Sequence, residues 1–127
     1  MIAQILIADD NVDITALLKD YLNAKNHRVI VVNDGFALSQ KAGEHQPHLI
    51  ITDIQMPGAY GSSVYQVLQK DPKTSGIPIL FMSAHPFEKI KHILPNDPKT
   101  RFVQKPISFA KLEELIHELL PLGGYVP

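Results

Sequence analysis

Four short apolar segments of this sequence lead into polar residues that could carry out phosphate chemistry. The run "ILIA" leads into Asp9 and Asp10, "HLIITD" ends at Asp53, "IPILFMS" ends at Ser83, and "RFVQKP" contains Lys105. Adjacent carboxylates repel one another unless a cation or hydrogen bonds hold them. Carboxylate oxygens without imidazole or thiolate favour magnesium or manganese, and magnesium keeps several waters that a phosphoryl oxygen can replace. The set therefore predicts phosphoryl transfer to an aspartate, with a metal and a lysine offsetting the developing charge.

These side chains can meet only if the strands that carry them end at one edge of a sheet. Apolar, β-branched runs that predict strands lie at Ile2–Ala8, Arg28–Val32, His48–Thr52, Ile77–Met82 and Arg101–Val103. They read as continuous apolar stretches separated by helical periodicity, which is typical of an α/β fold whose parallel sheet has helices on both faces. We predict a single doubly wound, five-stranded, flavodoxin-like sheet. If its strand order is 2-1-3-4-5, the polar residues share one edge.

Helical periodicity between the strands predicts the covering layers. The expected apolar faces comprise Val12, Leu17, Leu18, Tyr21 and Leu22 after an N-cap at Asp10 or Asn11, then Phe36, Leu38 and Ala42, then Val64, Val67 and Leu68, and finally Leu112, Leu115, Ile116, Leu119 and Leu120 after a cap at Ser108. The fourth helix is expected to be short, Pro86–Leu94, with Phe87, Ile90, Ile93 and Leu94 facing inward. Pro95 cannot continue it, and "PNDPKT" is turn chemistry.

Composition excludes several classes of function. The chain has 127 residues, 45% hydrophobic, a size typical of one domain. No cysteine is present, which excludes disulfides and thiolate metal sites and suits a reducing cytoplasm. The net charge of −1 without a basic stripe argues against nucleic-acid binding, and the N-terminal run is too short for a membrane span. We expect one domain over residues 1–121, with 122–127 as a C-terminal tail or the start of a linker.

Over essentially its whole length, the sequence resembles the CheY-like receiver domains of two-component response regulators. The resemblance rests on the acidic pair after the first strand, the run "DIQMPGAYG" (D-x-x-M-P-x-x-x-G), a Ser-Ala dipeptide and a Lys-Pro dipeptide, which place Asp9, Asp10, Asp53, Met56, Pro57, Gly61, Ser83, Ala84, Lys105 and Pro106. The segment "HPFEKIKHILPNDPKT" departs from the family, which usually has a full fourth helix and a Gly-Ala step there. That departure bears on the surface through which the family usually signals, and not on the phosphorylation chemistry.

The resemblance implies a role for each matching residue. Asp53 would accept the phosphoryl group, and a magnesium ion (or manganese) would be bound by Asp10, Asp53 and the backbone carbonyl of Gln55, with Asp9 acting mainly through water. It further implies that Ser83 swings toward the phosphoryl group beside Lys105, that Phe102 is the rotamer-switching aromatic, and that the bond to Pro106 is cis. The implied partners are a histidine kinase or phosphotransfer protein, an output domain or partner protein, and a second copy on phosphorylation, with no membrane.

Two other functions stay open at this point. An aspartate-nucleophile phosphohydrolase would need a second acid beside Asp53, where the chain has Ile54 and Gln55. A receiver-like module that only binds partners would normally have lost Asp10, Asp53 or Lys105, and all three are present. Taken singly, each residue also has an ordinary explanation, such as turn chemistry at Asp53 or helix capping at Ser83.

Overall fold

The five expected strands form one parallel sheet in the computed structural model, which describes residues 2–56 and 59–126. These strands are β1 (Gln4–Ala8), β2 (Arg28–Val32), β3 (Leu49–Asp53), β6 (Ile79–Ser83) and β7 (Thr100–Gln104), arranged in the order β2-β1-β3-β6-β7. Counted among themselves, they follow the order 2-1-3-4-5, which confirms the predicted fold class. Ala8 pairs with Thr52, and Asp53 pairs with Met82, so the carboxyl ends of β1, β3 and β6 lie together.

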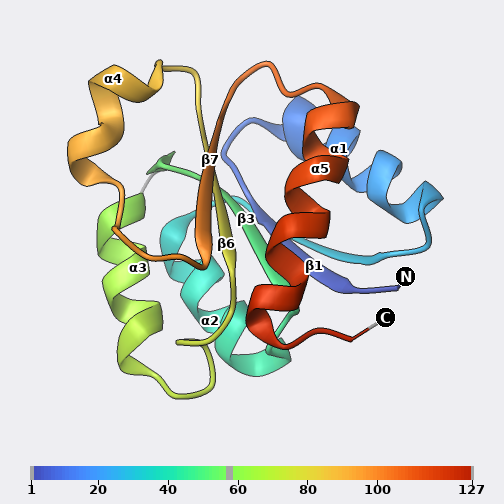
Figure 1. The fold of residues 1–127 in the computed structure, drawn as a ribbon, viewed down its shortest axis with the longest axis horizontal. Coiled ribbons are helices and arrows are strands. Elements are labelled where there is room, and N and C mark those ends of the chain that lie inside the picture. The colour runs from blue at the N-terminus through green and yellow to red at the C-terminus, as the bar shows by residue number, and fades with distance from the viewer. Residues whose placement is uncertain (1, 57–58, 127) are drawn as a thin grey trace.

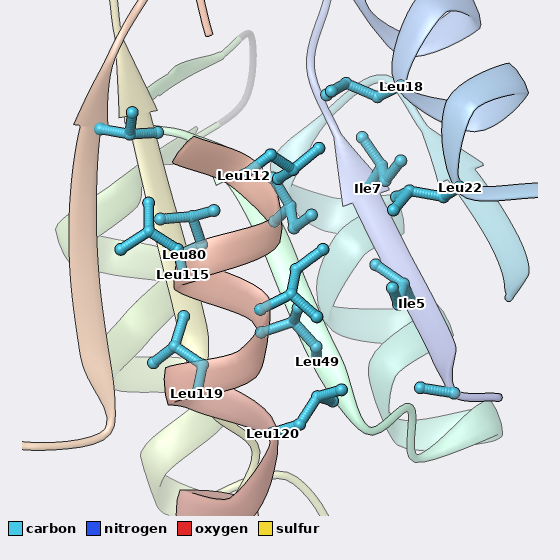
Figure 2. Close-up of a cluster of buried hydrophobic side chains, with 14 of the residues drawn as sticks. Ile5, Ile7, Leu18, Leu22, Leu49, Leu80, Leu112, Leu115, Leu119 and Leu120 are labelled. Carbon is cyan, nitrogen blue, oxygen red and sulfur yellow. The ribbon is translucent and has the colours of Figure 1, made fainter. Parts of the chain in front are cut away.

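Helices cover both faces of this sheet (Figure 1). α1 (Val12–Ala24) and α5 (Phe109–Leu119) pack on one face, whereas α2 (Gly35–His45), α3 (Gly61–Lys70) and α4 (Phe87–Ile90) pack on the other. Successive strand residues point to opposite faces, and both faces are buried, so the central strands are apolar throughout. Each face of the sheet therefore carries its own hydrophobic core. Figure 2 shows the first core, on the face covered by α1 and α5, where the leucines of α5 lie against β1, β3 and β6. These two layers hold the strand ends in place.

Two of the predicted helix caps are present. The side chain of Asn11 accepts hydrogen bonds from the N–H groups of Asp13 and Ile14, so Asn11 is the cap of α1 rather than Asp10. Ser108 caps α5 by accepting from the N–H of Lys111. Asp10 is therefore free of a capping role, which leaves its carboxylate available at the sheet edge.

Four residues predicted to lie on buried helix faces are instead exposed. These are Val12 (69% exposed), Leu17 (56%), Phe36 (76%) and Val67 (53%). In α1, the buried stripe is formed by Thr15, Leu18 and Leu22. Neighbouring helix positions differ by about 100°, so Leu17 turns away from the sheet when Leu18 faces it. Apolar type alone did not distinguish the two, because both are leucines.

The fourth helix is shorter than predicted. α4 spans only Phe87–Ile90, and a 3₁₀ turn, η1 (Lys91–Ile93), follows it. Leu94 then adopts an extended conformation before Pro95, as expected from the clash between a proline ring and the preceding residue. Ile90 is buried as predicted, but Phe87 is 49% exposed, so its predicted inward orientation is wrong. A single helical turn leaves the ring at the start of the helix to contact Phe102 instead.

A hydrogen bond from a tyrosine on α3 anchors the irregular loop that follows η1. The hydroxyl of Tyr65 donates a 2.6 Å hydrogen bond to Oδ2 of Asp97, and Oδ1 of Asp97 accepts from the N–H of Lys99. Burial, followed by this hydrogen bond and the charge of Asp97, raises the pKa of Tyr65 to about 12. Burial alone would raise the pKa of Asp97, but the bonds from Tyr65 and Lys99 outweigh it and lower the pKa. The stabilisation that ionised Asp97 gives to the folded state is therefore present at neutral pH. It is lost as the pH falls through the lowered pKa of Asp97.

Tyr65→Phe should loosen the loop selectively. We expect a loss of about 1–2 kcal/mol in the free energy of unfolding, because a hydrogen bond to a charged group is removed at a partly exposed site. We also expect faster amide exchange between Lys91 and Lys99, measured by hydrogen–deuterium exchange. Tyr21→Phe is the matched control, because Tyr21 donates to Glu113 between α1 and α5, away from this loop. Equal exchange of the loop in the Tyr65→Phe variant and the native protein would contradict this role.

The C-terminal residues pack against the amino end of the sheet. A second 3₁₀ turn, η2 (Leu120–Gly123), continues from α5, and a Cβ on Gly123 would lie 2.5 Å from Cδ of Pro78. The hydroxyl of Tyr125 donates to the carbonyl of Ile2, and its ring meets His48 edge-on. The segment from 120 to 125 is thus held on the fold, and the division at residue 121 stays a prediction.

Two smaller findings complete the fold. A short antiparallel pair that sequence patterns did not predict, β4 (Gln55–Met56) with β5 (Ala59–Tyr60), follows β3. Across the described residues, we find no helix with the length and apolar character needed to span a bilayer.

Candidate functional site

A lysine joins two carboxylates at the carboxyl edge of the sheet. Nζ of Lys105, directly after β7, lies 2.5 Å from Oδ2 of Asp53, to which it donates a hydrogen bond, and 2.7 Å from Oδ2 of Asp9. The Asp9 side chain is fully buried, and those of Asp53 and Lys105 are only 12% and 14% exposed. Because little water reaches these groups, their charges interact more strongly than a surface ion pair would.

The two carboxylates keep Lys105 positively charged. Burial alone lowers the pKa of this lysine, but the hydrogen bond to Asp53, the close contact with Asp9 and the charges of both raise the pKa above its ordinary value. Lys105 is therefore a fixed cation at neutral pH, placed where it can offset negative charge that arrives at Asp53.

The remaining oxygens of the two buried carboxylates hold the loops that follow them. Oδ1 of Asp9 accepts from the N–H of Asn11 at 2.9 Å, and Oδ1 of Asp53 accepts from the N–H of Gln55 at 2.8 Å. Each carboxylate is thus oriented by the residue two positions further on. This fixes the oxygen that faces Lys105 in each case.

Asp10 completes a cluster of three carboxylates that fits a divalent cation. One oxygen each from Asp9, Asp10 and Asp53 lie within 4.8 Å of one another, the sole such cluster of acidic or histidine ligands in the part of the chain that the structure describes. Three carboxylates and one lysine give a formal charge of −2 (−3 + 1). Oδ2 of Asp9 is buried and meets Lys105 as an ion pair without a hydrogen bond, which leaves it unsatisfied. Oxygen ligands, surplus negative charge and an unsatisfied buried oxygen suit magnesium.

Ser83 ends β6 beside β3 and is buried. Its Oγ accepts a 3.0 Å hydrogen bond from the N–H of His85, and its carbonyl accepts from the N–H of Lys105 at 2.8 Å. The hydroxyl therefore bonds to the adjoining loop and does not cap α4, whose N-cap is Pro86. The Lys105–Pro106 peptide bond is cis, as the resemblance implied.

The remaining residues that the sequence analysis named lie further from the carboxylate cluster, and one of them is not among the described residues. Phe102 is half-buried on β7 and packs on Phe87, with ring centroids 6.0 Å apart. Met56 packs into the second core, and Gly61 begins α3. Pro57 lies outside the described residues.

Sequence reasoning missed Asn33, which touches the backbone of the site. Its Nδ2 donates a 3.0 Å hydrogen bond to the carbonyl oxygen of Asp9. One signal could have found it: an amide side chain directly follows the second strand, at the same sheet edge as the carboxylates. The residue was overlooked because asparagine is also an ordinary turn residue.

Comparisons with known proteins agree with this geometry. The response regulator receiver domain family matches residues 5–117. The chain is 28% identical over 120 residues to the polar-differentiation response regulator DivK of Brucella ovis, covering 94% of this chain and 98% of DivK. It is also 28% identical to the sensor histidine kinase TmoS of Ectopseudomonas mendocina, covering 94% of this chain but only 12% of that protein.

Solved structures show the same fold. The receiver domain of the sensor histidine kinase PA1611 from Pseudomonas aeruginosa PAO1 aligns with a TM-score of 0.84 at 20% identity, covering 95% of this chain and 99% of that one. That structure holds a magnesium ion coordinated in its active-site cleft.

A parallel sheet that gathers three carboxylates and a lysine at one edge fits a phosphoacceptor signalling domain. The chain belongs to the response regulator receiver domain family of two-component systems. Domains of this family are signalling domains and not classical enzymes. They bind magnesium at an acidic pocket and work with histidine kinases.

Proposed function

We propose that Asp53 accepts a phosphoryl group from the phosphohistidine of a kinase or phosphotransfer protein. Asp9, Asp10, Asp53 and the carbonyl of Gln55 would hold the magnesium ion. The single observation that carries this proposal is the contact of Lys105 with both Asp53 and Asp9 beside the exposed Asp10. That arrangement puts one nucleophile, one fixed cation and a surplus of negative charge in the same place.

The transfer step follows from these positions. A carboxylate oxygen of Asp53 attacks the phosphorus, the P–N bond to the donor imidazole breaks, and the leaving nitrogen keeps the electron pair of that bond. Lys105 stays protonated and offsets charge on the phosphoryl oxygens. A bound magnesium ion would supply further neutralisation of the phosphoryl charge. The phosphohydrolase alternative lacks support, because Ile54 is apolar and an amide such as Gln55 cannot protonate a leaving group.

Ser83 would report the phosphoryl group to the rest of the domain. Its oxygen accepts from the N–H of His85, so the hydroxyl proton is available for a phosphoryl oxygen. Movement of Ser83 would pull on the loop before α4, which is a single turn with little stability of its own. The order of residues 86–99 and the rotamer of Phe102 are the expected output, read by an output domain, a partner protein or a second copy of the chain. We expect no contact of this domain with nucleic acid.

Phosphorylation by a small donor tests the function directly. Incubation with acetyl phosphate and magnesium should add one phosphoryl group, measured by intact-protein mass spectrometry, and hydroxylamine should remove it because an acyl phosphate is labile. A protein that acquires no labile phosphoryl group at any donor concentration would be a binding module, and the proposal would be wrong.

An apolar hollow next to the site is suited to a protein donor. It encloses about 450 Å³ between α1 and the loop after β7, and Lys105 is among its lining residues. Leu17 and Phe109 form exposed parts of its wall, and the Phe109 ring stacks on Tyr21. Lys105 lines this hollow and also contacts Asp53, so we propose that the kinase or phosphotransfer protein docks here.

Leu17→Asp should separate protein donors from small donors. A charge at the centre of an apolar contact should slow transfer from a phosphorylated histidine kinase core by about tenfold. The rate with acetyl phosphate should stay unchanged, because Leu17 lies outside the carboxylate cluster. Val67→Asp is the matched control, since Val67 is equally exposed but lies on α3, across the sheet. Equal slowing by both substitutions, or none by Leu17→Asp, would rule out this contact surface.

A further inference from the structure

Asn33 closes the gap between β1 and β2 where the two strands diverge. The last paired residues are Ala8 and Val32, and the N–H of Asp9 still reaches the carbonyl of Val32 at 3.3 Å. Two residues after Val32, Asp34 already caps α2 through the N–H of Ala37, so the chain leaves the sheet there. The side-chain amide of Asn33 supplies the next bond instead, by donating to the carbonyl of Asp9. This bond extends the strand pairing by one step.

The acceptor of that bond belongs to the peptide unit that joins Asp9 to Asp10. A peptide unit is planar, so fixing its carbonyl oxygen also fixes the direction in which the N–Cα bond of Asp10 leaves it. On the other side of Asp10, the N–H of Asn11 is held at 2.9 Å by Oδ1 of Asp9. The peptide units before and after Asp10 are thus both anchored, although the Asp10 side chain is itself exposed.

We propose that Asn33 is a positioning residue for the metal site, which aims the carboxylate of Asp10 by anchoring the peptide unit before it. This inference rests on the proposed function, because that function assigns Asp10 as a metal ligand. Asn33 is neutral and its bond is to backbone, so its effect is geometric and adds no charge to the site. Residues that orient metal ligands typically contribute a factor of about 10–100 in metal affinity. Because Asn33 acts only through the backbone, we expect its contribution to magnesium affinity to lie at the lower end of this range, about tenfold.

The test is the magnesium affinity of Asn33→Leu, which keeps the approximate shape but removes the donor. Titration calorimetry with magnesium chloride should show binding weakened by about tenfold relative to the native protein. Asn33→Gln retains an amide donor and should recover most of the affinity. Asn23→Leu is the matched control, since Asn23 is an exposed asparagine near the far end of α1. With saturating magnesium, Asn33→Leu should be phosphorylated by acetyl phosphate at near the native rate. The substitution should thus raise the magnesium concentration that the reaction requires without changing its maximal rate.

A thermodynamic cycle makes the outcome decisive. In the Asp10→Asn background, adding Asn33→Leu should weaken magnesium binding no further, because the carboxylate that Asn33 aims has already been replaced by an amide. Native affinity in Asn33→Leu would overturn the inference, even if the melting temperature without magnesium falls, because Asn33 would then have only a structural role. An equal loss in both backgrounds would overturn it as well. If the native protein does not bind magnesium at all, the proposed function fails, which is a distinct result.

Discussion

Asp53→Asn should reduce phosphorylation by acetyl phosphate by at least about a thousandfold, to the background of the assay. An amide cannot replace a carboxylate as nucleophile, and removing the nucleophile of a covalent mechanism has effects of this order or larger. Of the three clustered carboxylates, Asp53 is the one that accepts a hydrogen bond from Lys105. The measurement is intact-protein mass spectrometry after a fixed incubation, followed by peptide mapping of any modified site.

The control for this substitution is Asp20→Asn, which changes the same type of residue at an exposed position on α1. It should phosphorylate at the native rate. Melting temperatures of both variants establish that they fold, and Lys105 in Asp53→Asn keeps Asp9 as its partner. An Asp53→Asn protein labelled at another residue with native yield would contradict the assignment of the phosphoacceptor.

Magnesium should raise the melting temperature of the native protein, and Asp10→Asn should remove most of that increase. At a magnesium concentration about ten times the dissociation constant, mass action stabilises the folded state by about 1.4 kcal/mol. For a domain of this size, that corresponds to a shift of about 5 °C. Asp10→Asn should also raise the melting temperature in the absence of magnesium, because it relieves repulsion among three clustered carboxylates.

Circular dichroism is the suitable measurement, since the chain contains no tryptophan. Asp20→Asn again serves as the control, and its magnesium-dependent shift should equal that of the native protein. The two effects of Asp10→Asn have opposite signs, a higher melting temperature without the metal and a smaller response to it. General damage to the fold would lower both, so it cannot imitate this result. A native-sized shift in Asp10→Asn would show that Asp10 is not a ligand.

Much of this fold could be predicted from the sequence, because its signals are local. The alternation of apolar strands with helical periodicity identified the doubly wound sheet, since burial on both faces leaves an apolar run that is visible residue by residue. Pro95 predicted the end of the fourth helical segment for the same reason: a proline ring restricts the residue directly before it. The cap at Ser108 and the polar residues at the strand ends are likewise properties of a few adjacent positions.

Only the tertiary structure decided which of these residues meet and how. The bridge from Lys105 to Asp53 and Asp9 joins positions 52 and 96 residues apart, and it depends on the order of strands that no local pattern encodes. The same holds for the exposure of Leu17 beside the buried Leu18, because the rotation of α1 on the sheet is set by packing against α5 and β1. Asn33 is the clearest case. Its type and position fit an ordinary turn, and its contact with Asp9 exists because two strands 24 residues apart diverge at that point. Strand order, helix rotation and strand divergence arise from contacts between distant segments, which is why only the folded chain could reveal them.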